Sequence, residues 1–517
     1  MDWVERLRPI VTAEIRGTVV QTVGITVAAA GFPAPIGAIA EIERQGTAPI
    51  RAEVVGFKND LTLLFPYGDR QGVRHGNVVR LAKTVRWLRV GSGLLGRVIN
   101  AEGSAVDGKP QPLLSDRVYY DAAPPHPCSR PRIDEPLPTG IRVIDGFLAC
   151  GKGQRLGIFS AAGVGKSVLL GMMAKYTAAD VNVIALIGER GREVNDFLER
   201  DLGPEGLAKS VVVVATSNEP AVLRVQAALA ASAIAEYFRD QGKDVLLLMD
   251  SLTRFALAQR EIGLAAGEPP TTKGYTPSVF ALLPRLVERA GRSPAGAITG
   301  FYTVLVEGDD PNEPVADAVR GLLDGHIWLS RKLAGRGHFP AVDVTASLSR
   351  LMPDIVPAEH NRAAMKLREL LAAYRDHEDL LSIGAYRRGS NPLVDAALAM
   401  REEMDGFGRK CGSARNIPKR SRDSCNWPIA ARPPRPDRRL NSRKSPGKVG
   451  YITAAKPRQV VDRKAPCSGT ASRTPSPTGT ADLVRPGKND HRGGKRWPVN
   501  RRGRPGRAEP EGRERKR

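Results

Sequence analysis

Eight consecutive residues, 160–167, have the types and spacing of a phosphate-binding loop. They read Ser-Ala-Ala-Gly-Val-Gly-Lys-Ser, after an apolar run that predicts a strand and before a segment that predicts a helix. Gly163 and Gly165 permit backbone conformations in which successive N–H groups converge on phosphate oxygens. The Lys166 ammonium would contact the β- and γ-phosphates, and the Ser167 hydroxyl would ligate Mg²⁺. The motif therefore predicts ATP and Mg²⁺ as ligands and ATP hydrolysis as the reaction.

The loop departs from the strict pattern at one position, because Ser160 stands where glycine is usual. The order of strand, loop and helix around it is complete, which disfavours a chance glycine-rich turn. The residues predicted to bind ATP follow Ser160 directly in the chain: Ala161, Ala162, Gly163, Val164, Gly165, Lys166, Ser167 and Val168.

Two carboxylates follow other predicted strands. Asp250 ends the apolar run Asp-Val-Leu-Leu-Leu-Met-Asp, where a Walker-B acid would hold Mg²⁺ through water. An alternative is that Asp250 only caps the helix that follows it. Glu189 lies just past another strand and is the candidate that orients and polarises the attacking water. Glu193 is its rival, although a negative charge at a helix start is also favoured by the helix dipole.

Charge that develops on the transferred phosphoryl group requires a further cation. An arginine finger supplies about 10³–10⁵ in rate in enzymes of this kind. Arg190, Glu193 and Arg254 are accessory candidates for the site. The residue pattern does not choose among the finger candidates, which are Arg254, Arg320, Arg331 and Arg350.

The net charge of +23 lies entirely in one part of the 517-residue chain. Residues 409–517 hold 31 Lys and Arg against 8 Asp and Glu, and the rest of the chain holds 47 residues of each sign. The main body is therefore electrically neutral, and the basic balance does not indicate that it binds nucleic acid.

The cysteines and the apolar runs bear on the compartment. None of the five cysteines has metal-ligand or CxxC spacing, which is typical of a reducing cytoplasm. The N-terminal residues show no apolar signal region, and no run of about 18 apolar residues is present. We expect a cytoplasmic protein without a transmembrane helix.

The elements that must position these residues form three regions. Short β-branched strands with turn signals over 17–90 predict a small barrel or sandwich, and 91–150 is Gly- and Pro-rich like a linker. From 154 onwards, continuous Val/Ile/Leu strands alternate with helices, which predicts a doubly wound α/β domain. Residues 357–403 predict helices. Beyond 406, the Arg/Pro/Gly/Ser-rich sequence lacks apolar periodicity and predicts disorder.

A short segment before the first strands has apolar residues at helical spacing, over residues 3–11. A helix packed on the barrel is one interpretation. A docking or membrane-surface segment is the other.

Several longer stretches resemble one family. They are LACGKGQRLGIFSAAGVGKS, IGERGREV, the segment from LLLMDSLTRF to LVERAG, and DDPNEPVADAVRGLLDGHI. These resemble the export ATPases of bacterial flagella and type III secretion systems, relatives of the catalytic subunit of rotary ATP synthases. The wording looks closer to the flagellar branch.

The resemblance implies a RecA-like P-loop core with an N-terminal β-barrel, a C-terminal helical domain and a disordered basic tail. The implied domains are an N-terminal helix and barrel (1–90), the P-loop ATPase domain (91–356), a C-terminal helical domain (357–408) and the tail (409–517).

The resemblance also assigns roles to residues beyond the loop. The family's water-activating glutamate falls at Glu189, and its Walker-B acid falls at Asp250. Its arginine finger, which reaches into the neighbouring subunit's site, falls at Arg350. An aromatic residue that packs on adenine falls at Phe339, which could instead be a core residue, and Tyr386 would close the other side of the base.

A ring of identical subunits follows from these assignments. Glu189 and the finger Arg350 are on one chain, so complete sites form only between copies of it. The resemblance makes this ring a homohexamer. Non-catalytic ATP synthase subunits typically lack the glutamate at the Glu189 position, so its presence favours a catalytic chain.

The implied function is to energise protein export. The implied partners are a stator-like regulatory subunit, a central stalk protein, the export gate and chaperone–substrate complexes, at the cytoplasmic face of the inner membrane. The alternatives are the catalytic subunit of a proton-translocating ATP synthase and a ring-shaped nucleic-acid motor. The neutral body makes nucleic acid an unfavoured partner.

The tail is where the sequence departs from the family, which normally ends soon after the position of Met404. A frameshifted read-through of GC-rich DNA is one hypothesis for residues 409–517. A genuine basic tail for acidic lipid or nucleic acid is the other. The first hypothesis would leave the C-terminal helical domain truncated.

Overall fold

The computed structural model describes residues 14–306, 310 and 313–409. The helix predicted over residues 3–11 lies outside the described residues. The disorder predicted beyond residue 406 also lies outside them, except at residues 407–409, where the prediction is wrong because these residues continue the last helix.

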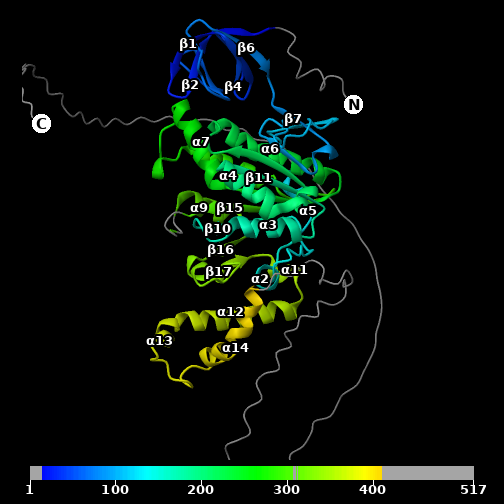
Figure 1. The fold of residues 1–517 in the computed structure, drawn as a ribbon, viewed down its shortest axis with the longest axis vertical. Helices are drawn as coiled ribbons and strands as arrows, with labels where there is room; N and C mark the ends of the chain where they lie inside the picture. Colours follow the sequence, from blue (N-terminus) through cyan, green and yellow to red (C-terminus); the bar gives the residue numbers. More distant parts are fainter. Residues whose placement is uncertain (1–13, 307–309, 311–312, 410–517) are drawn as a thin grey trace, which may run out of the picture. The chain divides into compact units, whose positions relative to one another are not determined.

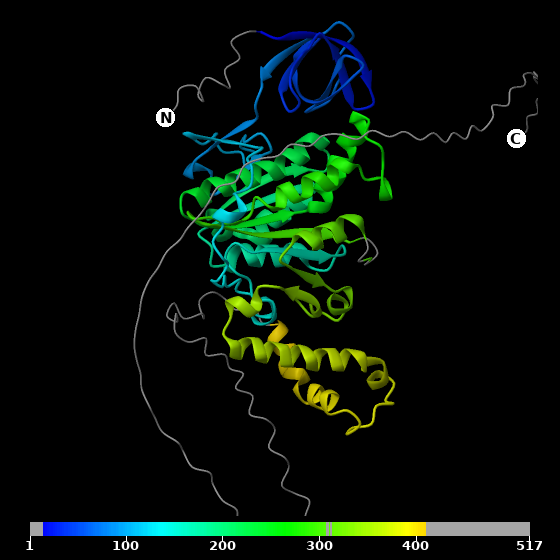
Figure 2. The same cartoon turned by 180° about the vertical axis from the view of Figure 1, so that it is seen from behind.

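The first six strands close into an antiparallel barrel, in the order β1-β2-β5-β4-β3-β6 (Figures 1 and 2). Apolar side chains such as Val27, Ile42 and Leu64 are fully buried and form a core cluster of their own. The alternation of the short strands therefore gives the barrel that the sequence predicts. Its strands are β1 (Arg16–Val23), β2 (Thr26–Ala30), β3 (Ile39–Arg44), β4 (Thr47–Lys58), β5 (Leu61–Pro66) and β6 (Val78–Lys83).

The segment 91–150, predicted as a linker, instead contributes structure to the central domain. Strand β8 (Arg97–Asn100) pairs in parallel with β12 and forms one edge of the large sheet. Strands β7 (Trp87–Val90) and β9 (Asp116–Tyr119) form a separate antiparallel ladder. The linker prediction is wrong here because a four-residue edge strand has too little sequence to show a pattern of its own.

The central sheet has nine strands and is mainly parallel. Its order is β17-β16-β10-β15-β13-β11-β12-β8, with β14 paired to β15. Strands β14 and β17 run antiparallel to their partners. The other strands are β10 (Arg155–Ser160), β11 (Val181–Glu189), β12 (Ser210–Thr216), β13 (Asp244–Asp250), β14 (Gly291–Arg292), β15 (Ala297–Leu305), β16 (Gly325–Leu329) and β17 (Val342–Ser349).

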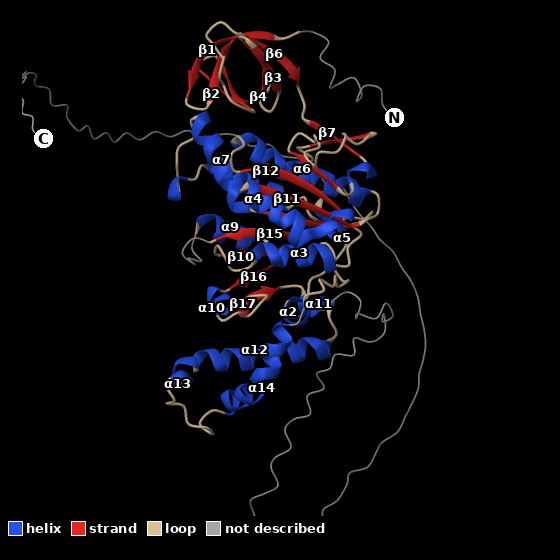
Figure 3. Cartoon of the chain, in the orientation of Figure 1, coloured by secondary structure: helices blue, strands red, loops and turns tan. Residues whose placement is uncertain are grey.

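Helices cover both faces of this sheet (Figure 3), and each face has its own apolar core. Among the described residues, α6 alone is long and apolar enough to cross a membrane, and 89% of its apolar window is buried in the fold. The helices are α2 (Arg142–Phe147), α3 (Lys166–Tyr176), α4 (Gly191–Asp196), α5 (Gly203–Ala208), α6 (Ala221–Asp240), α7 (Leu252–Ala266), α8 (Pro277–Val287), α9 (Pro314–Leu322), α10 (Arg331–Gly335) and α11 (Met352–Ile355).

Short irregular turns complete the domain. The helical segment after β11 is divided, because α4 is followed by the π-helix η3 (Phe197–Leu202). The 3₁₀ turns are η1 (Ser92–Leu94), η2 (Pro127–Ser129) and η4 (Thr272–Gly274).

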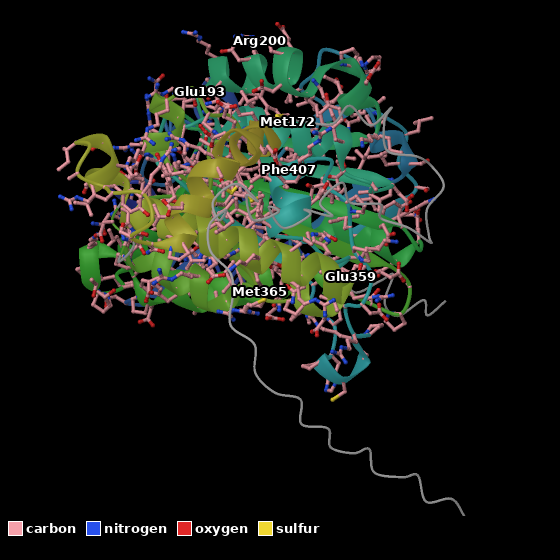
Figure 4. The ribbon with its side chains drawn as sticks, turned by 90° about the horizontal axis from the view of Figure 1, so that it is seen from below. Met172, Glu193, Arg200, Glu359, Met365 and Phe407 are labelled. Atoms are coloured by element: carbon pink, nitrogen blue, oxygen red, sulfur yellow. The ribbon has the colours of Figure 1, made fainter. Side chains whose placement is uncertain are left out.

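The last described elements are α12 (Ala358–Asp376), α13 (Glu378–Ser382) and α14 (Pro392–Arg409). Helices α12 and α14 pack on each other and on α2. Phe407 of α14 meets Phe147 edge to face, with ring centroids 5.8 Å apart. Met172 of α3 and Phe407, both labelled in Figure 4, pack against the same core cluster. The C-terminal helices are therefore continuous with the core on the α3 face of the sheet.

Candidate active site

The phosphate loop connects the end of β10 to the start of α3. Gly163 and Gly165 have φ angles of 80° and 87°, in the left-handed region that favours glycine. Gly165 is also the residue that precedes the first turn of α3. The two glycines thus let the chain reverse between strand and helix, with the helix N-terminus directed into the loop.

The surface of the loop alternates between anchored and open residues. Ala161 and Val164 are buried in the core, whereas Ala162, Gly163, Ser167 and Val168 are exposed. The Ser160 hydroxyl is buried and has no hydrogen-bond partner among the described residues. The buried residues fix the loop, and the exposed ones leave its outer side open to a ligand.

Lys166 lies between two carboxylates from neighbouring strands. Its ammonium is 2.5 Å from Asp250 Oδ1 and 3.4 Å from Glu189 Oε1. Burial opposes the charged form of Lys166, but Asp250 and Glu189 outweigh it and hold the lysine pKa above its usual value. The loop lysine therefore stays charged, and a triphosphate must compete with Asp250 for it.

Glu189 is mostly buried at the end of β11, with a side chain 14% exposed. Burial raises the pKa of Glu189 to about 7; Lys166 opposes this rise, and Asp250 and Glu193 add to it. The Glu193 carboxylate accepts a hydrogen bond from Glu189, which lowers the pKa of Glu193. A carboxyl group with a pKa near neutrality can take up a proton at physiological pH.

Asp250 lies at the tip of β13 and is 4% exposed. The helix cap that the sequence allowed for Asp250 is supplied by its neighbour, because the Ser251 hydroxyl accepts a hydrogen bond from the Arg254 backbone N–H. The Asp250 carboxylate is bonded by Lys166 and by the Thr303 hydroxyl. Thr303 is a site residue that the sequence analysis missed; its only signal was a polar side chain within an apolar strand.

The donor set fits Mg²⁺. Ser167 and Asp250 offer a hydroxyl and a carboxylate oxygen, and Mg²⁺ at phosphate sites takes one or two such ligands beside water and phosphate. Within the described residues, no group of three or more His, Cys, Asp and Glu forms a cage for a tightly held metal. The oxygens present therefore suit an ion that arrives with the nucleotide.

Arg350 lies near the start of β10, whereas the phosphate loop of the same chain follows the end of β10. Its backbone N–H donates to Asp324 O, and Asp324 N–H donates to Arg155 O at the start of β10. Ser160, at the end of β10, is five residues farther along, or about 16 Å at the rise of a parallel strand. The exposed Arg350 side chain therefore starts from the end of β10 that is opposite to its own phosphate loop.

The other arginines divide by location. Arg254 packs its side chain against Gly188, beside Glu189, and its buried Nε has no hydrogen-bond partner among the described residues. Arg190 is 80% exposed and pairs with Glu193 at 3.6 Å. Arg320 pairs with Asp317 on α9, and Arg331 begins α10. Among the four finger candidates, Arg254 is thus the one that contacts the backbone beside Glu189 within one chain.

The two aromatic candidates differ in their surroundings. Phe339 is 49% exposed, so it is not a core residue. Its ring lies against the loop, 3.3 Å from where a Cβ on Gly165 would stand. The Tyr386 hydroxyl bonds Asn391 O at 3.0 Å and Asp395 Oδ1 at 3.1 Å. Phe339 therefore borders the phosphate site, whereas Tyr386 is held by the chain leading into α14.

A cavity of about 270 Å³ lies outside the phosphate loop. It is bounded by α2, β17, α10, α12 and α14, and no residue of 160–167 lines it. Its wall includes His338, which precedes Phe339 in the chain. We assign phosphate binding to the loop and its neighbouring carboxylates and not to this cavity, because phosphate recognition requires the loop N–H groups and Lys166.

Two family models match the chain. Residues 140–349 match the nucleotide-binding domain of the ATP synthase alpha/beta family. Residues 356–409 match the C-terminal domain of the type III secretion ATPase EscN. The second match favours a secretion ATPase over a subunit of a proton-translocating ATP synthase or a nucleic-acid motor.

The chain is similar to named relatives over most of their length. It is 53% identical to the flagellum-specific ATP synthase of Bacillus subtilis over 393 residues, covering 76% of this chain and 90% of the relative. It is also 53% identical to the type 3 secretion system ATPase of Xanthomonas euvesicatoria, covering 76% and 89%. These two identities do not separate the flagellar branch from the injectisome branch.

Solved structures agree with the sequence comparisons. The assembled ATPase EscN of the enteropathogenic E. coli type III secretion system superposes with a TM-score of 0.72 at 44% identity, covering 77% of this chain and 97% of that one. EscN in complex with its central stalk EscO gives a TM-score of 0.71. The predicted fold of barrel, P-loop core and C-terminal helices is confirmed, and the chain belongs to the family of flagellar and type III secretion export ATPases.

Proposed function

We propose that this chain hydrolyses Mg·ATP at sites that two neighbouring copies of it build together, and that the resulting ring energises protein export. One observation carries the proposal. Lys166, Glu189 and Asp250 converge at the phosphate loop, while the backbone of the finger candidate Arg350 lies at the level of Arg155, at the start of β10, and the loop follows the end of that strand, about 16 Å farther along.

Each residue has a distinct role in this proposal. The loop N–H groups and Lys166 hold the phosphates, and Ser167 and Asp250 hold Mg²⁺, which neutralises charge on the phosphate oxygens. Glu189 orients the attacking water and accepts its proton. Because the pKa of Glu189 is about 7 in this site, the carboxyl group exchanges a proton near neutral pH.

The accessory residues surround Glu189. Arg254 lies beside it, and its guanidinium can bond a phosphate oxygen. Glu193 and Arg190 form an exposed pair that holds the Glu189 carboxyl through Glu193. Phe339 stacks on adenine, and Tyr386 closes the other side of the base when the C-terminal region approaches it.

The ring is a homohexamer in this proposal. The comparison with an assembled EscN supports assembly, and the complex of EscN with EscO supports a central stalk partner. We extend this to a stator-like regulator, the export gate and chaperone–substrate complexes, at the cytoplasmic face of the inner membrane. The tail is then a frameshifted read-through, and an intact reading frame at the codons for residues 407–410 would refute that part.

The test is ATPase activity against protein concentration for the wild-type chain and for Arg350→Ala. Activity per subunit should rise with concentration as rings form, because each site needs an arginine from a neighbour. Arg350→Ala should lose about 10³-fold in kcat, at the lower end of the range for an arginine finger. Arg331→Ala, which also replaces an arginine of this chain by alanine, serves as the control. Activity that is independent of concentration and insensitive to Arg350→Ala contradicts shared sites.

A further inference from the structure

A buried hydroxyl on the neighbouring strand holds the Asp250 carboxylate. Thr303 belongs to β15, which lies between β13, the strand of Asp250, and β10, the strand of the phosphate loop. The Thr303 side chain is fully buried, and its Oγ1 donates a 2.7 Å hydrogen bond to Asp250 Oδ1. The Lys166 ammonium bonds the same oxygen at 2.5 Å. Two donors therefore converge on one oxygen of a nearly buried carboxylate.

The other carboxylate oxygen is in a different position. Among the described residues, no hydrogen bond to Asp250 Oδ2 is formed. The two oxygens of a carboxylate are chemically equivalent, and the terminal torsion of an aspartate is broad, so a hydrogen bond to one oxygen restricts the rotation of the group. A permanent donor to Oδ1 therefore fixes the plane of the Asp250 carboxylate.

Lys166 cannot be that permanent donor. The ammonium must leave Asp250 to contact phosphate oxygens when a nucleotide binds, because it is the loop's only full positive charge. Thr303 has no such competing role. It lies within a strand that is paired on both sides, with β13 and with β10, so its hydroxyl stays in place when Lys166 moves.

A second link joins β15 to the start of α7, the helix that follows Asp250. The backbone N–H of Leu305, two residues beyond Thr303, donates to the Thr253 hydroxyl at 2.8 Å. Thr253 lies in the first turn of α7, just after Asp250. Strand β15 therefore holds both the carboxylate and the turn that follows it.

We infer that Thr303 is a positioning residue that holds the Asp250 carboxylate in the orientation in which it would bind the Mg²⁺ of bound nucleotide. This inference rests on the metal role proposed for Asp250. It makes the threonine a determinant of magnesium-dependent nucleotide affinity, although the threonine itself touches neither metal nor substrate.

The test is calorimetric binding of ADP to the full chain, with Mg²⁺ and with EDTA. Thr303→Val keeps the side-chain shape and removes the hydroxyl, so affinity for Mg·ADP should fall about tenfold, the effect of one hydrogen bond to a charged group. Affinity for ADP in EDTA should stay unchanged. Thr303→Ser retains the hydroxyl and should restore the affinity for Mg·ADP.

The same strand offers a matched control. Thr299 is also buried on β15, and its hydroxyl accepts a 2.9 Å hydrogen bond from Gly153 N–H at the far end of the strand. Thr299→Val should leave both affinities unchanged. Equal losses with Mg²⁺ and with EDTA in Thr303→Val, or no loss in either, would overturn the inference.

Asp250→Asn separates this inference from the proposed function. If Asp250→Asn removes the Mg²⁺ dependence and Thr303→Val does not, only the role of Thr303 is wrong. If Asp250→Asn keeps the full Mg²⁺ dependence, the metal role of Asp250 is wrong as well. Circular dichroism of each variant establishes whether the compared chains are folded. If Thr303→Val is not folded, the comparison of Thr303→Ser with wild type still tests the inference.

Discussion

Replacing Glu189 by glutamine should stabilise the folded chain at alkaline pH. Burial holds the pKa of Glu189 at about 7 instead of 4.5, so the folded state resists ionisation of this carboxyl group. Below pH 4.5 the carboxyl is neutral in both the folded and the unfolded chain and costs nothing. As pH rises through 7, the folded chain loses the stability that the proton supplied, and Glu189→Gln avoids this loss because it stays neutral.

The expected magnitude follows from the two pKa values. Their difference corresponds to about 3 kcal/mol of folding free energy. The side chain is only 14% exposed, so solvent screening reduces this value little. The difference in unfolding free energy between Glu189→Gln and wild type should therefore grow by about 3 kcal/mol between pH 4.5 and pH 8.5. A constant contribution of the glutamine amide cancels, because only the change with pH is compared.

Guanidinium unfolding without nucleotide, followed by circular dichroism at several pH values, measures this difference. Glu205→Gln on α5 is the control, because Glu205 is exposed and its carboxylate meets water in both states. Its effect is the baseline with which the effect of Glu189→Gln is compared. If Glu189→Gln and wild type differ by the same amount at every pH between 4.5 and 8.5, Glu189 is not the buried, near-neutral carboxyl group of this account.

Three further changes test the loop, the aromatic residue beside it, and a buried ion pair elsewhere in the domain. Gly165→Ala places a Cβ on a residue with left-handed backbone and towards Phe339. It should lower the free energy of unfolding by about 1–2 kcal/mol and weaken ATP binding measured by calorimetry. An unchanged affinity for ATP would contradict the loop geometry. Phe339→Ala should weaken ATP binding about tenfold because base stacking is lost, whereas Phe339→Tyr should keep the wild-type affinity. Equal affinities of the two variants in a fluorescent-nucleotide titration would refute the stacking role. Arg289→Met leaves the buried Glu236 unpaired and should cost about 3–5 kcal/mol in guanidinium unfolding, much of it recovered by adding Glu236→Leu; a single variant as stable as wild type would contradict this.

The phosphate loop was predictable because its geometry is local. Gly163 and Gly165 need left-handed backbone, Lys166 begins a helix, and an apolar strand precedes them, all within a few residues. The strand-end positions of Glu189 and Asp250 were predictable for a similar reason, because parallel strands end at one edge of a sheet. Family resemblance supplied the finger at Arg350, which residue types alone could not distinguish from other arginines.

Long-range pairing was not predictable from the sequence pattern. Strand β8 joins the sheet only through pairing with β12, more than 100 residues later, and it has four residues of its own. The position of Arg350 along the strand direction, relative to the phosphate loop, depends on the antiparallel register of β16 and β17. The hydrogen bond from Thr303 to Asp250 links residues 53 apart in the chain. Such contacts follow from strand order, which periodicity does not encode.

In this account, each catalytic site contains Glu189 from one copy of the chain and Arg350 from the next copy. Mixing inactive Glu189→Gln with inactive Arg350→Ala tests it directly, because a mixed ring contains interfaces that pair an intact Glu189 with an intact Arg350. Random mixing in equal amounts makes about a quarter of all interfaces complete, so about a quarter of the wild-type ATPase activity should return. A mixture that assembles and stays as inactive as either variant alone would contradict the account.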